Sequence, residues 1–244
     1  MAAQLTPFAL ETELGRLHAW SRAAGTQAGH PPLLCLHPLP FDGAFFDAAA
    51  PWLGARRDLI CPDYPGFGGS EPLPEPWSVE AWAAAFEVAT ARLLPKRPVD
   101  VLGFHTGCLV GVQLALAAPG RVRRLVLVDV PYFDTEQRQA VAARITNAPR
   151  YVGKPHAVQG FRAAFAWDPL PGFRRLAHPT LVIGGGTDLH GPSEAAARAA
   201  PGARFLGRPD LVKPVFETGG AAIGACCDAF LGSDPHRSLP PGPV

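Results

Sequence analysis

The segment from residue 99 to residue 130, VDVLGFHTGCLVGVQLALAAPGRVRRLVLVDV, constrains the fold of this chain more than any other. It opens with an apolar run, turns sharply at Gly-Phe-His-Thr-Gly (residues 103–107), continues as a helix rich in small residues and closes with a second apolar run. Strand, sharp turn, helix and strand in this order form the repeating unit of a parallel sheet. The turn displays His105 between two glycines, and we expect positive φ there.

Short apolar runs and helical patterns alternate along the rest of the chain. A chain of 244 residues that is 48% hydrophobic can bury one sizeable core, so a single domain over residues 1–244 is predicted. The alternation predicts an α/β fold, with a mostly parallel central sheet and helices on both faces. The predicted strands are 14–20, 33–37, 58–62, 99–103, 124–129, 180–184 and 203–207. The predicted helices are 45–55, 79–94, 107–118, 194–199 and 220–231.

One long interval, residues 131–179, interrupts the alternation. It is too long for a plain crossover, and it is rich in aromatic residues. Long inserts over the carboxyl edge of a sheet are often functional, so a lid or cap is predicted here. The alternative is that the aromatic residues only pack the insert onto the body. The Pro-rich, polar residues 232–244 are predicted to be a disordered tail.

Charge and composition limit the classes of partner. The chain has 22 Lys and Arg against 21 Asp and Glu, without a dense basic run. We therefore expect a small-molecule partner, no nucleic acid and no membrane. The absence of a secretory pattern or a spanning apolar window favours a cytoplasmic protein. The five cysteines lack zinc-like spacing, so free thiols are expected, and neither a metal nor a cofactor is predicted.

Four motifs occur in an order that resembles the α/β-hydrolase fold family over nearly the whole chain. They are LLCLHPLPF (33–41), CPDYPGFGGS (61–70), LGFHTGC (102–108) and PTLVIGGGTDLHGP (179–192). By resemblance they are the oxyanion loop, the glycine-rich turn after the next strand, the nucleophile elbow, and the strand and loop that hold the acid of the catalytic triad. One such motif is weak evidence, whereas four in order strongly indicate this family.

The resemblance implies roles for single residues. Asp188 falls at the position of the triad acid, and the backbone N–H groups of Leu39 and Thr106 fall where an oxyanion is bound. His37 is expected to brace the oxyanion loop. His105 replaces the usual serine nucleophile. The segment that carries the catalytic histidine aligns with residues 208–220, which contain none, so the resemblance implies a degenerate triad with Val212 or Lys213 at the vacated position.

A histidine at the elbow suggests a mechanism without a seryl intermediate. The ring of His105 reaches further from the backbone than a serine hydroxyl, and a water molecule can bridge it to Asp188. The pair is then a general base with its orienting carboxylate, acting on water or on a carbon acid. A small, largely apolar carbonyl compound is the expected substrate, with hydrolysis, or a lyase or isomerase step, as the reaction. The alternative is a pseudoenzyme or a small-molecule-binding protein that kept the pocket and lost catalysis.

Four further residues are candidates with open alternatives. Asp129 and Tyr132, at the end of a strand beneath the insert, are expected to line the pocket, although Asp129 is equally suited to bracing the strand end. His190 follows Asp188 by two residues and is either a substitute base or solvent-facing. Asp63 is expected to cap the turn over residues 64–70 through hydrogen bonds between its side chain and the backbone of that turn.

Overall fold

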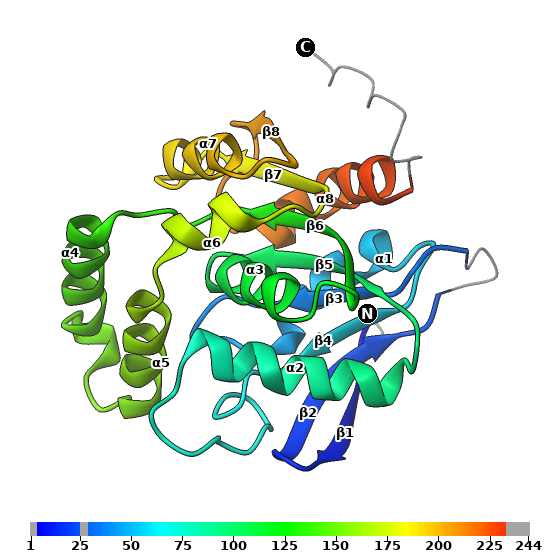
Figure 1. Ribbon diagram of the computed structural model, residues 1–244, viewed down its shortest axis with the longest axis horizontal. Coiled ribbons are helices and arrows are strands. Elements are labelled where there is room, and N and C mark those ends of the chain that lie inside the picture. The colour runs from blue at the N-terminus through cyan, green and yellow to red at the C-terminus, as the bar shows by residue number, and fades with distance from the viewer. Residues whose placement is uncertain (1–3, 25–28, 233–244) are drawn as a thin grey trace.

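Eight strands form one sheet in the order β1-β2-β4-β3-β5-β6-β7-β8 in the computed structural model, which describes residues 4–24 and 29–232 (Figure 1). Two antiparallel pairings, β1 with β2 and β2 with β4, join a hairpin to six parallel strands. The hairpin consists of β1 (Thr6–Thr12) and β2 (Gly15–Arg22). The parallel strands are β3 (Leu33–Leu36), β4 (Leu59–Pro62), β5 (Val99–Phe104), β6 (Val122–Val128), β7 (Thr180–Gly185) and β8 (Ala203–Arg208).

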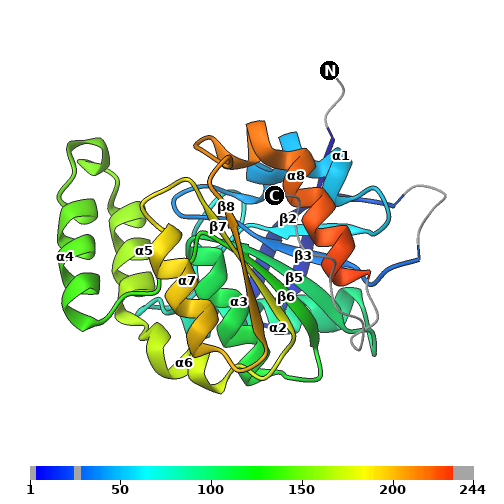
Figure 2. The same ribbon diagram turned by 90° about the horizontal axis from the view of Figure 1, so that it is seen from above.

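Helices cover both faces of this sheet, which confirms the predicted α/β class (Figure 2). Successive residues of a strand point to opposite faces, so Leu34 and Leu36 pack into one core while Leu33 and Cys35 pack into the other. Helices α2 (Val79–Leu93), α3 (Thr106–Ala117), α6 (Pro169–Arg175) and α7 (His190–Ala199) contribute to the first core. The second is covered by η1 (Gly43–Ala49), α1 (Ala50–Leu53) and α8 (Val215–Leu231).

The insert forms four helical segments: α4 (Thr135–Thr146), η2 (Pro149–Tyr151), α5 (Pro155–Ala166) and α6. Helix α4 begins with a capping box between Asp134 and Gln137, contains no buried residue, and lies at the outer side of α5 (Figure 1). Arg138 ties the two helices together by donating hydrogen bonds to the carbonyl oxygens of Phe165 and Trp167. Apart from Gly232, the predicted tail lies outside the described residues.

Four expectations about the secondary structure differ from what is observed, and one of them is the start of α8, which begins at Val215, five residues before the predicted start. The edge strand β1 is not predicted at all, and the predicted helix 45–55 is a 3-10 segment followed by one short helical turn. Helix α7 begins at His190, four residues before the predicted start, because a proline is tolerated in the first turn of a helix. Within the described residues, none of the helices combines the length and apolar character needed to cross a membrane.

The turn between β5 and α3 places His105 at the carboxyl edge of the sheet. His105 has φ 49° and ψ −112°, which confirms the expected positive φ, and α3 starts at the next residue. A Cβ atom on Gly107 would overlap the Leu36 carbonyl oxygen, and one on Gly103 would lie 2.6 Å from the Gly107 oxygen. Both positions therefore require glycine, because here the backbones of β3, β5 and α3 are in direct contact.

Replacing Gly107 with alanine is expected to lower the free energy of unfolding by ~3 kcal/mol, measured by urea denaturation. The added methyl group meets the backbone of β3, which cannot move aside as a side chain can. Alanine also favours a helix by about 1 kcal/mol over glycine, so the observed loss is net of that gain. Gly120→Ala is the matched control, since nothing lies within 4 Å of its Cβ position. Equal stabilities of the two variants would contradict the packing described here.

Candidate functional site

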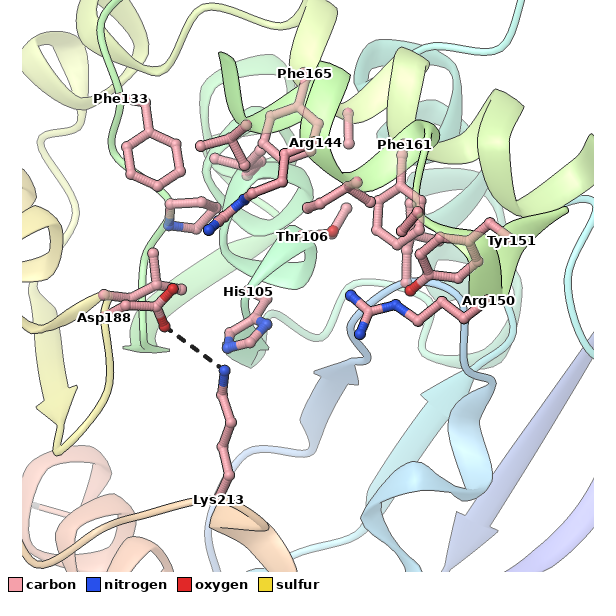
Figure 3. Close-up of a pocket in the computed structure, with 18 of the residues that line it drawn as sticks. His105, Thr106, Phe133, Arg144, Arg150, Tyr151, Phe161, Phe165, Asp188 and Lys213 are labelled. Atoms are coloured by element: carbon pink, nitrogen blue, oxygen red, sulfur yellow. Dashed lines mark ion pairs between the residues drawn. The ribbon is translucent and has the colours of Figure 1, made fainter. Parts of the chain in front are cut away.

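A cavity of about 680 Å³ lies at the carboxyl edge of the sheet, between His105 and the insert (Figure 3). This volume is within the range of ~300–1,000 Å³ that is usual for small-molecule pockets. Residues of the insert line one side of the cavity, while its role as a movable lid stays a prediction. Much of the wall is apolar and includes Leu39, Leu109, Phe133, Phe161, Phe165 and Leu189.

The imidazole of His105 lies in this cavity against the ring of Phe104, with 4.0 Å between the ring centroids. Its Nε2 atom is buried and has no hydrogen-bond partner among the described residues. The pKa of His105 is lowered to about 4, first by burial and then by the positive charge of Lys213, while the negative charge of Asp188 opposes both effects. The ring is therefore neutral at pH 7 and offers a lone pair at one nitrogen.

Asp188 forms an ion pair with Lys213, with 3.6 Å between Oδ1 and Nζ, in front of His105 (Figure 3). Both side chains are more than 60% exposed, so water and salt screen this attraction. Two residues were predicted to take the position of the missing histidine. Of these, Lys213 lines the cavity, whereas Val212 is 50% exposed and does not line it. No direct hydrogen bond joins Asp188 to His105 in the described structure, so the water-bridged pair stays a prediction.

Two backbone N–H groups face the cavity region without partners. The amides of Leu39 and Thr106 donate no hydrogen bond to any described residue, and both residues line the cavity. Thr106 is the first residue of α3, where the N–H groups of a helix have no acceptor within the helix. Such a pair of donors has the chemistry needed to bind a developing oxyanion.

His37 lies beneath the oxyanion loop and is fully buried. Its Nδ1 is 3.0 Å from the Pro38 carbonyl oxygen, and its Nε2 accepts the N–H of Tyr64 at 3.2 Å. These partners fix one neutral tautomer, with the proton on Nδ1. Burial lowers the pKa of His37 to about 4. The imidazole thus ties the oxyanion loop to the segment after β4, as expected for a bracing residue.

Asp63 holds the glycine-rich turn and the oxyanion loop together. One carboxylate oxygen accepts the N–H of Gly43 at 2.7 Å, and the other accepts the N–H of Gly69 at 2.8 Å. The second oxygen also lies 2.7 Å from Nδ1 of His18. The capping role expected for Asp63 therefore extends beyond its own turn to the start of η1.

Asp129 and Tyr132 do not line the cavity, although the sequence favours that position for both. Asp129 accepts the N–H of Gly185 at 2.7 Å, which braces the ends of β6 and β7, and its Oδ2 atom is buried without a partner in the described residues. Tyr132 packs edge-on against Phe173 of α6. The two residues follow the strand end as predicted, and the bracing role that was the alternative for Asp129 is the one observed.

His190 is neither a substitute base nor a solvent-facing residue. Its Nδ1 lies 3.1 Å from the carbonyl oxygen of Gly185, and its ring packs edge-on against Phe205 of β8. The small residues Gly184 and Gly207 leave room for the ring on the sheet. His190 is the first residue of α7, and these contacts hold its ring against β7 and β8.

Sequence reasoning missed the two arginines of the cavity wall, Arg144 and Arg150. Both lie in the insert, whose fold has no motif to place them. The sequence shows only that the insert contains several basic residues. Their number does not distinguish an arginine that faces solvent from one that lines a cavity. Among the described residues, no group of three or more His, Cys, Asp or Glu side chains is arranged to hold a metal ion.

Lowering the pH is expected to destabilise the protein through His37. Its pKa is about 4 when folded and near 6.5 when unfolded, so the unfolded state binds more protons between these values. The free energy of unfolding should therefore decrease by up to ~3 kcal/mol as the pH falls from 6.5 to 4. Urea denaturation across this range should show a smaller decrease for His37→Gln than for the native chain. Gln139→Ala, a change at an exposed position that carries no titratable group, should leave the pH dependence unaltered; an equal effect of both variants would refute this assignment.

Comparison with known proteins agrees with the fold. A family model for the alpha/beta hydrolase fold matches residues 31–163, which is more than half of the chain. The pimeloyl-(acyl-carrier protein) methyl ester esterase of Aromatoleum aromaticum is 35% identical over 149 residues, which are 60% of this chain and 54% of that protein. The 3-hydroxybutyrate-oligomer hydrolase of Cupriavidus necator is 34% identical over 152 residues, which are 62% of this chain and 48% of that protein.

The chain thus spans about half the length of these curated relatives. Among solved structures, a hydrolase from Pseudomonas aeruginosa matches 96% of this chain and 100% of its own, with a TM-score of 0.74 and 23% identity. That likeness extends the shared fold beyond the residues covered by the family model. On the strength of the match over residues 31–163, the chain belongs to the α/β hydrolase fold family.

Proposed function

We propose that this protein is a hydrolase that cleaves a small, largely apolar carbonyl compound without a seryl intermediate, with His105 as the base. The observation that carries the proposal is the position of His105. A neutral imidazole lies at the elbow, in a cavity shared with the unpartnered amides of Leu39 and Thr106. The relatives above are named esterases and hydrolases, which supports an ester as the first substrate class to test.

The proposed reaction needs one water molecule and no covalent enzyme intermediate. His105 accepts a proton from water while the water oxygen attacks the carbonyl carbon. The carbonyl electron pair moves to oxygen, and the resulting oxyanion accepts hydrogen bonds from the Leu39 and Thr106 amides. Collapse of this intermediate breaks the bond to the leaving alkoxide, which takes the proton from the imidazolium. The products are a carboxylic acid and an alcohol, and His105 returns to its neutral form.

The alternative function is binding without catalysis. Its support is the pairing of Asp188 with Lys213, because a carboxylate engaged by an ammonium group is less available to orient His105. A lyase or isomerase reaction on a carbon acid uses the same base and the same oxyanion donors. A turnover screen with ester, lactone, epoxide and diketone substrates separates these functions, and a binding protein converts none of them.

Cytoplasmic location is part of the proposal and rests on the sequence alone.

The native protein should resist serine-directed phosphonate probes at the elbow. These reagents capture a hydroxyl group that a neighbouring imidazole has activated, and His105 occupies the place of that hydroxyl. The variant His105→Ser should show no esterase activity, since Lys213 and not a histidine borders the new hydroxyl. Intact-mass spectrometry after labelling provides the measurement. Labelling of the native chain at Thr106 or any serine would contradict the proposed mechanism.

Turnover by the native protein should stay nearly constant from pH 8 to pH 5.5. A base works in its unprotonated form, and with its pKa lowered to about 4 by burial, His105 loses activity only as the pH approaches that value. His105→Ala and His105→Asn should both abolish turnover, and asparagine tolerates the positive φ better than alanine does. With a neutral ester as substrate, an acid limb near pH 6.5, or activity that survives both variants, would exclude His105 as the base.

A further inference from the structure

The charged side chains of the cavity wall are unbalanced. Three of them are cationic, Arg144, Arg150 and Lys213, and one is anionic, Asp188. The whole chain carries a formal net charge of only +1, so the cavity concentrates positive charge that the rest of the molecule does not have. The side chain of Lys213 is engaged by Asp188, which leaves the two arginines of the insert as the excess.

Neither arginine has an anionic partner within the described structure. Arg150 lies over the ring of Tyr151, with 5.1 Å from the guanidinium carbon to the ring centroid, and Arg144 has no recorded contact with an acceptor. Arg138, on the same insert, behaves differently: it pairs with Asp168 at 3.4 Å and donates to backbone carbonyl groups. The insert thus contains one arginine that stabilises the fold, Arg138. It also contains two arginines, Arg144 and Arg150, whose guanidinium groups have no acceptor among the described residues.

The unused donors are directed into the cavity. Figure 3 shows the guanidinium groups of Arg144 and Arg150 reaching from two sides toward the space in front of His105. The dipole of α4 favours a cation in its last turn, which accounts for a positive charge at Arg144 but not for a second one in η2. A planar guanidinium is well suited to bind two oxygens of a carboxylate or phosphate group.

We propose that the cavity binds an anionic amphiphile, in which a carboxylate or phosphate group lies between Arg144 and Arg150 and an apolar body packs on the phenylalanines of the wall. This inference rests on the proposed function, because it concerns the same pocket. It narrows the substrate class from apolar carbonyl compounds to those that also carry an anionic group. The apolar wall and the cationic rim then recognise two ends of one molecule. Both arginines are exposed, so the selectivity is moderate and decreases with added salt.

An anion in this position also affects the base. The charged groups that face His105 are Lys213, Asp188, Arg144 and Arg150. After burial, the charge of Lys213 is the next cause that lowers the pKa of His105. A bound anion offsets this positive field and raises that pKa, so the substrate strengthens the base that acts on it. NMR titration of the His105 ring should show the higher pKa when an alkyl carboxylate is bound.

The test measures binding by calorimetry and does not depend on turnover. Hexanoate, pentyl phosphate and hexanamide have the same five-carbon alkyl chain, and both anions should bind the native protein at least ~10-fold more tightly than the amide. The tighter of the two anions identifies which oxygen acid the cavity prefers. In the double variant Arg144→Gln/Arg150→Gln, the preference over the amide should fall to within ~2-fold. Arg162→Gln, an exposed arginine of α5 outside the cavity wall, is the matched control and should leave it unchanged.

Three results would overturn the inference: equal binding of hexanoate, pentyl phosphate and hexanamide, an anion preference that persists in the double variant, or an equal loss in the control. These results are distinct from failure of the proposed function. If the anions bind through the arginines and no ester is hydrolysed, the binding inference stands and the catalytic proposal fails. If esters are hydrolysed through His105 with no preference for anions, the reverse is true.

Discussion

The contact between the backbones of α3 and β3 is the constraint on which the site depends. Because residue 107 has no Cβ atom, the first turn of α3 lies directly over the carbonyl oxygen of Leu36. This contact sets the path of the chain at His105, including its positive φ. It also brings the first free amide of α3 close to the loop that follows β3, where the Leu39 amide lies. The absence of one Cβ atom therefore places the imidazole and the two unpartnered amides, of Leu39 and Thr106, at one edge of the sheet.

Electrostatics then decides what the imidazole can do. Burial keeps His105 neutral, which preserves its ability to accept a proton and limits its strength as a base. A conventional triad corrects such weakness with a buried carboxylate that touches the ring. Here the corresponding carboxylate, Asp188, is exposed and paired with Lys213. In the proposed mechanism, the charge of an anionic ligand would replace the missing support, and recognition and reactivity would then be coupled in this pocket.

The fold was predictable from the sequence because its signals are local. The apolar runs that became β3 to β8 are bounded by glycine, proline or polar residues, and the elbow glycines are required by backbone contacts that recur wherever this turn forms. The edge strand β1 was missed because half of its residues are polar or exposed and only pairing with β2 defines it. The positions of His105, Leu39 and Thr106 follow from their motifs.

The rest of the site depends on long-range geometry. The direction of Asp129 and Tyr132 is set by hydrogen bonds and packing with β7 and α6, segments more than 40 residues away in sequence. His190 was ambiguous because the start of α7 decides where its ring points. Arg144 and Arg150 reach the cavity only when the insert folds over the sheet, and no local sequence pattern predicts that arrangement.

Helix α4 has a kinetic consequence that follows from its lack of buried residues. Segments with few buried contacts open in local fluctuations that cost much less free energy than global unfolding. Amide hydrogens of α4 should accordingly exchange with solvent far faster than those of β5, which is buried along its whole length. Ligand entry would then be governed by a local opening equilibrium of one helix. Changes in α4 would alter the rates at which ligands associate and leave, while the thermal stability of the sheet would remain that of the native protein.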